Sequence, residues 1–245
     1  MPFTVLVVLA LAVGSLVEAI PMFFDKENVK EIASVMPYTP LEVVGRDIYI
    51  REGCYNCHSQ MVRPFRFETE RYGEYSKAGE YVYDHPFQWG SKRTGPDLFR
   101  VGGKYPSLWH VRHMRQPDST TPGSVMPRYP HLWTDRYDTS LIASKLRALR
   151  TVGVPYTDGE IETAISAMER QAKAITADVE QQQGPKGLGD KEIVALTAYL
   201  QRLGTDIRWK RPAFAPAFGT SGTPAGATAG QAPAGTPAGA AAGQR

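Results

Sequence analysis

The chain of 245 residues has little cysteine and little net charge. Its only two cysteines, Cys54 and Cys57, exclude a disulfide-rich scaffold and a zinc site made of four cysteines. The formal net charge of +3 is too small for a protein built around nucleic acid, which would carry a clustered basic stripe. We find no internal repeat and no strong strand pattern. The sequence therefore predicts a mainly α-helical protein with no nucleic-acid partner.

The C-terminal residues 212–245 lack the side chains that a core requires. They are rich in Ala, Gly and Pro, and after Phe218 they contain no larger aliphatic or aromatic residue. Such a segment cannot bury enough apolar surface to offset the loss of chain entropy, so we predict a disordered tail without chemistry of its own.

Residues 2–24 form the one long apolar run, and Glu18 is the only ionisable side chain in it. A helix of this length spans roughly 34 Å, enough to cross a hydrocarbon core of about 30 Å. A cleaved signal peptide is the alternative, but a basic n-region is missing and the apolar run continues to Phe24. We therefore predict a transmembrane anchor at 1–24, a connector at 25–38, a folded domain at 39–211 and the tail at 212–245.

Apolar periodicity and capping residues predict several helices within the domain. Thr39, Pro40 and Glu42 begin the first, and Gly53 ends it. The stretch 59–94 has no clean period and is expected to be a long ordered loop. Further helices are expected at 107–116, stopped by Pro117, at 139–150, at 157–183 behind a Thr157–Glu160 capping box, and at 190–203 with Asp190 as N-cap. The 157–183 helix either packs on its own domain or faces a partner subunit.

The motif Cys54-Tyr55-Asn56-Cys57-His58 has the C-x-x-C-H spacing of covalent haem attachment. Two thiols at this spacing can each form a thioether to one edge of a porphyrin, and the adjacent histidine can then ligate the iron. A zinc ribbon would need a second ligand pair, a thioredoxin-type site would need a βαβ setting, and a disulfide would leave His58 unexplained. We therefore predict one covalent haem c.

The haem iron needs a second axial ligand or an open position, and several side chains are candidates. Met61 is too close to His58 in sequence to reach the opposite face of the ring. Met126 lies in a loop stiffened by three prolines, which suits the presentation of a thioether. The remaining candidates, for which ordinary packing or exposure is the simpler interpretation, are Met114, His85, His110, His113 and His131.

Gly95-Pro96-Asp97-Leu98 is the candidate for orienting His58. A ligating histidine generally donates its other N–H to a carbonyl, and a stiff proline supplies one well. A simple turn explains the same four residues equally well.

These residues together resemble a class I c-type cytochrome. The resemblance rests on Gly45 and Tyr49, the C-x-x-C-H motif, Thr94-Gly95-Pro96-Asp97-Leu98, the Met-Pro loop and Tyr199-Leu200. It implies a helical fold in which the first and last helices cross near the haem. It also implies that Pro96 accepts the N–H of His58 and that Met126 is the distal ligand. The spacing from Gly45 to Cys54 is one residue longer than in small members of the family.

A narrower resemblance covers most of residues 14–210. The strings 14–18, 51–61 and 84–93, with the Met-Pro loop, are similar to the mono-haem subunit II of cbb3-type cytochrome c oxidase. The resemblance implies a bacterial inner-membrane complex with the haem domain in the periplasm. The partners that it implies are a haem–copper catalytic subunit, which reduces oxygen to water, a di-haem cytochrome c subunit and membrane lipid.

Three alternatives are kept. The cytochrome subunit of a nitric oxide reductase or a stand-alone anchored cytochrome would have the same single haem, but the string 89–93 favours the oxidase. A haem-based gas sensor would need a free iron position. A peroxidase-like enzyme would need an open iron and an acid–base residue such as His110 or His113.

Overall fold

Helices make up the regular structure of residues 2–24 and 31–207, which the computed structural model describes. The order is α1 (Pro2–Phe24), α2 (Pro40–Arg51), η1 (Cys54–Asn56), α3 (Arg66–Tyr72), η2 (Ala78–Tyr81), α4 (Ser107–Arg115), α5 (Pro117–Thr120), η3 (Pro130–Trp133), α6 (Ile142–Thr151), α7 (Asp158–Glu162), α8 (Ala164–Gln181) and α9 (Glu192–Arg202). Within these ranges the only β pairing is an isolated bridge between Arg136 and Lys191. The predicted mainly α-helical class is confirmed, and the tail at 212–245 lies outside the described residues.

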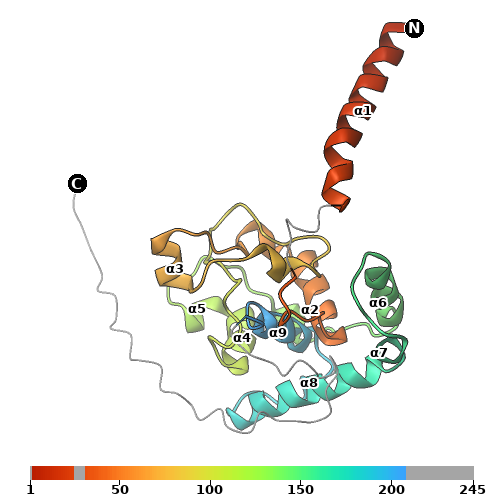
Figure 1. The fold of residues 1–245 in the computed structure, drawn as a ribbon. Helices are drawn as coiled ribbons and strands as arrows, with labels where there is room; N and C mark the ends of the chain where they lie inside the picture. Colours follow the sequence, from red (N-terminus) through yellow and green to blue (C-terminus); the bar gives the residue numbers. More distant parts are fainter. Residues whose placement is uncertain (1, 25–30, 208–245) are drawn as a thin grey trace, which may run out of the picture.

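Helix α1 stands clear of the remaining helices (Figure 1). Its side chains are exposed over residues 2–20, and residues 2–20 are long and apolar enough to cross a membrane. An apolar helix that buries nothing in its own domain needs another apolar environment, and a lipid bilayer supplies one. Helix α1 therefore fits a membrane anchor that precedes a helical domain.

The core is organised by the crossing of α2 and α9, which lie together at the centre of the domain (Figure 1). Gly45 of α2 lies against the main chain of α9, because a Cβ placed on Gly45 would be 2.0 Å from the carbonyl oxygen of Ala195. The rings of Tyr49 and Tyr199 meet beside this point, with centroids 5.4 Å apart. The helix crossing that the resemblance implied is therefore present, and the extra residue before Cys54 does not disturb it.

The predicted helix at 157–183 is interrupted. Thr163 has non-helical backbone angles, so α7 ends at Glu162 and α8 begins at Ala164. The Thr157–Glu160 capping box is present as predicted. Ile165, the second residue of α8, is 48 % exposed, whereas Ala164 and Met168 are buried. The buried face of α8 packs against α2, α4 and α9 of its own domain.

The helix expected at 107–116 ends before Pro117 as predicted, and Pro117 also begins the short helix α5 after the extended Gln116. Two smaller expectations were wrong in detail. Asp190 is not the N-cap of α9, since Lys191 holds that position and Asp190 pairs with Arg136 at 2.7 Å. The stretch 59–94 contains α3 and η2 and is not wholly irregular, although aromatic side chains do pack it internally.

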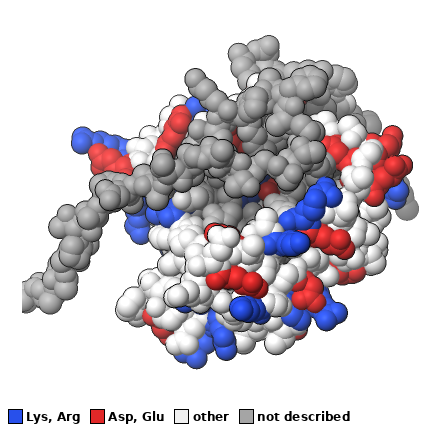
Figure 2. All heavy atoms as spheres, turned by 90° about the horizontal axis from the view of Figure 1, so that it is seen from below, with Lys and Arg blue, Asp and Glu red and all other residues white. Residues whose placement is uncertain are grey.

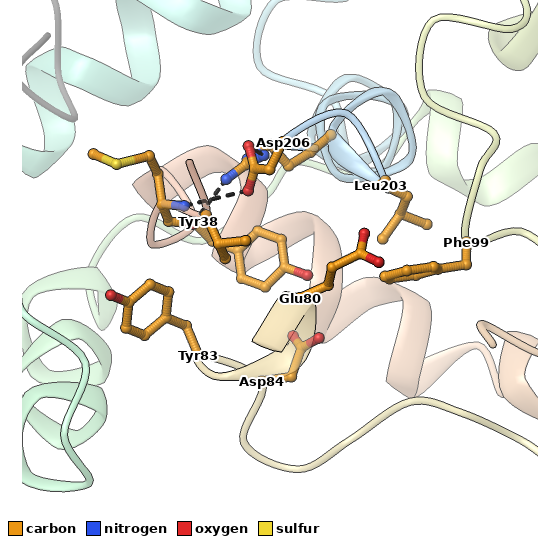
Figure 3. Close-up of a pocket in the computed structure, with 11 residues that line it drawn as sticks. Tyr38, Glu80, Tyr83, Asp84, Phe99, Leu203 and Asp206 are labelled. Carbon is orange, nitrogen blue, oxygen red and sulfur yellow. Dashed lines mark hydrogen bonds and ion pairs between the residues drawn. The ribbon is translucent and has the colours of Figure 1, made fainter. Parts of the chain in front are cut away.

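The part of the predicted connector nearest the domain packs against the end of α9. The carbonyl of Met36 accepts a hydrogen bond from Arg202 at 2.7 Å, and the Met36 N–H donates to Asp206 at 3.2 Å. These residues line a cavity of about 30 Å³, the volume of about one water molecule. Figure 3 shows Tyr38 and Asp84 beside it, and burial raises the pKa of Asp84 to about 6.

Charged side chains of both signs are interspersed over the face seen in Figure 2. This follows from the nearly equal numbers of Lys and Arg, 28, and of Asp and Glu, 25.

The substitution Gly45→Ala is expected to destabilise the domain by about 1–3 kcal/mol, since the added methyl would force α2 and α9 apart. Gly159→Ala is the control, because no atom lies within 4 Å of a Cβ at that position and alanine favours the helix. Urea unfolding of the full chain in detergent measures both. An unchanged midpoint in Gly45→Ala, with the same slope, would contradict the close helix crossing.

Candidate functional site

The C-x-x-C-H motif forms a tight turn directly after α2. Gly53 adopts a left-handed conformation, φ 70°, which ends the helix and redirects the chain into η1. The carbonyl of Cys54 then accepts main-chain hydrogen bonds from Cys57 at 3.1 Å and His58 at 2.9 Å. This local fold places both thiols and the imidazole along one wall of a cavity.

The cavity has a volume of about 550 Å³, within the range typical of sites for small molecules and cofactors. It is lined by the C-x-x-C-H turn, by α4 and by the loop 121–129. Leu196 and Leu200 of α9 and Leu98 and Val101 supply apolar walls. The crossing of α2 and α9 therefore forms part of the site as well as the core.

His58 is oriented by the turn that contains Pro96. Its Nδ1 lies 2.8 Å from the carbonyl oxygen of Pro96, and because a carbonyl only accepts, the proton must be on Nδ1. The Nε2 lone pair is then available to a metal. Burial lowers the pKa of His58, against the opposing influence of Pro96 and Asp97, so the ring is neutral at pH 7.

Gly95 leaves room for this imidazole. A Cβ on Gly95 would lie 2.2 Å from Cε1 of His58, a distance that no side chain can occupy. In the sequence, Gly95 is recognisable only as part of a turn. Its role as a flat support for the ring depends on a contact between residues 37 positions apart and could not be seen in the local sequence.

Four of the candidate ligands lie in the lining of this cavity. Met126, Met114, His110 and His113 all line the cavity, whereas Met61, His85 and His131 do not. Nδ1 of His113 is 2.5 Å from the hydroxyl of Thr120. Met114 is buried in the core on α4, while Met126 is partly buried in the loop.

The residues present fit a covalently attached haem. The two thiols are free and are not joined to each other. Burial raises the pKa of Cys54 to about 12, whereas a thioredoxin-type pair needs a readily formed thiolate. Residues 2–24 and 31–207 contain no cluster of three or more His, Cys, Asp or Glu side chains suited to a metal ion.

Comparison with protein families decides the class of protein. A model of the family "Cytochrome C oxidase, mono-heme subunit/FixO" matches residues 1–207. The chain belongs to this family. A search of curated proteins found no match.

Family membership confirms the resemblance to the mono-haem subunit of an oxidase. This FixO-family chain is a subunit of a cytochrome c oxidase, an oxidoreductase complex, and carries one haem. It therefore has partner subunits in that complex. The match includes α1, which fits a membrane anchor. The alternative of a nitric oxide reductase subunit is not supported.

His110 makes the site sensitive to acid. Its Nε2 is buried without a hydrogen-bond partner among the described residues, and burial lowers its pKa to about 4. Because the folded-state pKa lies below the unfolded value of about 6.5, stability falls as the pH drops from about 6.5 toward 4.

The substitution His110→Leu is therefore expected to remove part of the stability loss between pH 7 and pH 5, by about 1–2 kcal/mol. It also removes an unpartnered buried nitrogen, so stability at pH 7 should be equal or higher. Urea unfolding of the full chain at the two pH values measures this effect. If the free energy of unfolding of the variant fell between pH 7 and pH 5 as much as that of the unaltered chain, His110 would not be neutral in the folded protein.

Proposed function

We propose that this FixO-family chain passes electrons through one covalently attached haem c toward the haem–copper subunit of a cbb3-type oxidase. Cys54 and Cys57 hold the haem by thioethers, and His58 and Met126 are the axial ligands. The haem, when bound, supplies one-electron chemistry at its iron. The protein residues attach and orient it and exclude water, and no substrate is turned over on this chain itself.

The observation that carries the proposal is the coincidence of the C-x-x-C-H turn with the His58–Pro96 contact on one wall of an apolar cavity. Both cysteines and His58 line that cavity, and Nδ1 of His58 lies 2.8 Å from the Pro96 oxygen. A hydrogen bond from the far ring nitrogen fixes the tautomer and the ring plane of a ligating histidine. A mainly apolar cavity keeps the reorganisation energy of electron transfer small, and a small reorganisation energy suits an electron carrier.

Met126 is favoured as the distal ligand by its position and by the stiffness of its loop. It lines the cavity from the 121–129 segment, whereas Met61 does not reach the cavity. Met114 lies on α4, where it belongs to the hydrophobic core. A thioether paired with imidazole raises the reduction potential, which suits a carrier that delivers electrons to an oxidase.

The proposed partners are the haem–copper catalytic subunit and a di-haem cytochrome c subunit, with lipid around α1. We place the haem domain on the periplasmic side of a bacterial inner membrane, held by α1 as a single-pass anchor. Membership of an oxidase family and the apolar helix α1 support this arrangement.

Removal of both thiols, in Cys54→Ala/Cys57→Ala, is expected to abolish covalent haem, while each single change leaves one thioether. Haem staining after denaturing electrophoresis reads out the attachment. The control is Met114→Ala, which removes a cavity-lining sulfur that is not proposed to bind haem and should still stain. Staining of the double variant on this chain would contradict the assignment.

The substitution Met126→Ala is expected to open the iron to carbon monoxide, and Met126→His is expected to lower the reduction potential, because imidazole favours ferric iron more than thioether does. Spectra of the reduced and ferric full chain measure both effects, including the far-red band of ferric iron bound by a thioether. Met114→Ala should change neither. Loss of that band in Met114→Ala, with its survival in Met126→Ala, would reverse the assignment.

A further inference from the structure

Two segments of the chain meet behind His58, residues 57–61 and 95–99. The N–H of Gly95 donates to the carbonyl of Cys57 at 2.9 Å, and the N–H of Leu98 donates to that of Ser59 at 2.8 Å. These two hydrogen bonds lie on either side of the contact between His58 and Pro96 along the chain. The position of the Pro96 carbonyl therefore depends on what keeps the two segments in register.

The carboxylate of Asp97 joins these segments. It accepts hydrogen bonds from the Ser59 hydroxyl at 2.6 Å and the Met61 N–H at 2.8 Å in one segment, and from the Phe99 N–H at 2.9 Å in its own. Its side chain is fully buried. Three hydrogen-bond donors therefore surround this buried carboxylate, which lies one residue from Pro96.

Arg93 supplies the opposite charge on the same network. Its Nε donates to the Ser59 hydroxyl at 2.6 Å, and its Nη2 donates to the Met61 carbonyl at 2.9 Å. The guanidinium also lies 3.4 Å from Asp97 and 2.8 Å from the buried carboxylate of Glu68. Buried carboxylates without a cationic partner are costly, and Arg93 serves both of these, while Glu68 is also paired with Arg63.

The Ser59 hydroxyl connects the two charges, since it accepts from Arg93 and donates to Asp97. Ser59 follows His58 directly in the chain, and Asp97 follows Pro96. A displacement of either charged side chain would therefore be transmitted to both partners of the His58–Pro96 contact.

We propose that Asp97 and Arg93 are positioning residues for His58 and that their opposite charges set the reduction potential of the haem. This inference rests on the proposed function, because it requires His58 to hold the iron. Oxidised haem carries one more positive charge than reduced haem. A nearby carboxylate therefore lowers the potential, and a nearby guanidinium raises it.

The test uses the full chain with its haem, purified in detergent, and a spectroelectrochemical titration of the haem together with urea unfolding. Asp97→Asn should shift the potential upward, and Arg93→Gln should shift it downward. Arg93→Lys keeps the charge but loses the planar fork, so it should lower the unfolding midpoint with a smaller shift of potential than Arg93→Gln.

The matched control is Asp206→Asn. Asp206 is also a largely buried carboxylate paired with an arginine, Arg202, but it lines the small cavity of Figure 3 and not the haem cavity. Loss of the Asp206 charge should lower the unfolding midpoint and leave the reduction potential unchanged. Should Asp97→Asn fail to fold, Glu68→Gln removes the other carboxylate on Arg93 and should also shift the potential upward.

The proposal would be overturned if the reduction potential shifted in the same direction in Asp97→Asn and Arg93→Gln. It would also be overturned if the potential were unchanged in both variants. In either case the network would have a structural role only. Absence of haem from the unaltered chain would contradict the proposed function instead. The two failures are therefore distinguishable in one set of samples.

Discussion

The close approach of α2 and α9 at Gly45 is the constraint on which the rest of the structure depends. With only a hydrogen in place of a Cβ, the main chain of α9 at Ala195 can lie directly against α2. That approach brings Tyr49 against Tyr199 and turns Leu196 and Leu200 toward the cavity. The same helix α2 ends just before the C-x-x-C-H turn. One helix pair therefore fixes both a wall of the cavity and the position of the thiols.

The site consists of short segments that are individually irregular and hold each other in place. The turn after α2, the Gly95–Pro96 turn and the 121–129 loop have few helical hydrogen bonds of their own. Hydrogen bonds between segments replace them, such as those from Gly95 to Cys57 and from Leu98 to Ser59. A buried carboxylate with a guanidinium beside it then closes the network. Such a network holds the His58 side chain in one orientation without regular secondary structure.

Helices with both a cap and an apolar period could be predicted from the sequence. The first helix of the domain begins behind Thr39 and ends before Gly53 as its capping residues indicate. The interruption at Thr163 could not be predicted, because the apolar spacing continues across it and only the packing of α8 decides where the helix restarts. The prediction of Asp190 as the N-cap of α9 was wrong for a similar reason, since Asp190 forms an ion pair with Arg136 and Lys191 is the N-cap.

For the site, the C-x-x-C-H motif is evident from the sequence, because Cys54, Cys57 and His58 lie within five consecutive residues. The sequence also indicates a membrane anchor, since a long apolar run can be identified without knowledge of tertiary contacts. Only the folded structure shows that His85 and His131 are not part of the cavity lining, and that Gly95 lies against the His58 ring. Sequence spacing constrains local geometry only. Contacts between residues tens of positions apart depend on how the helices cross, and that is settled by the packing of the whole domain.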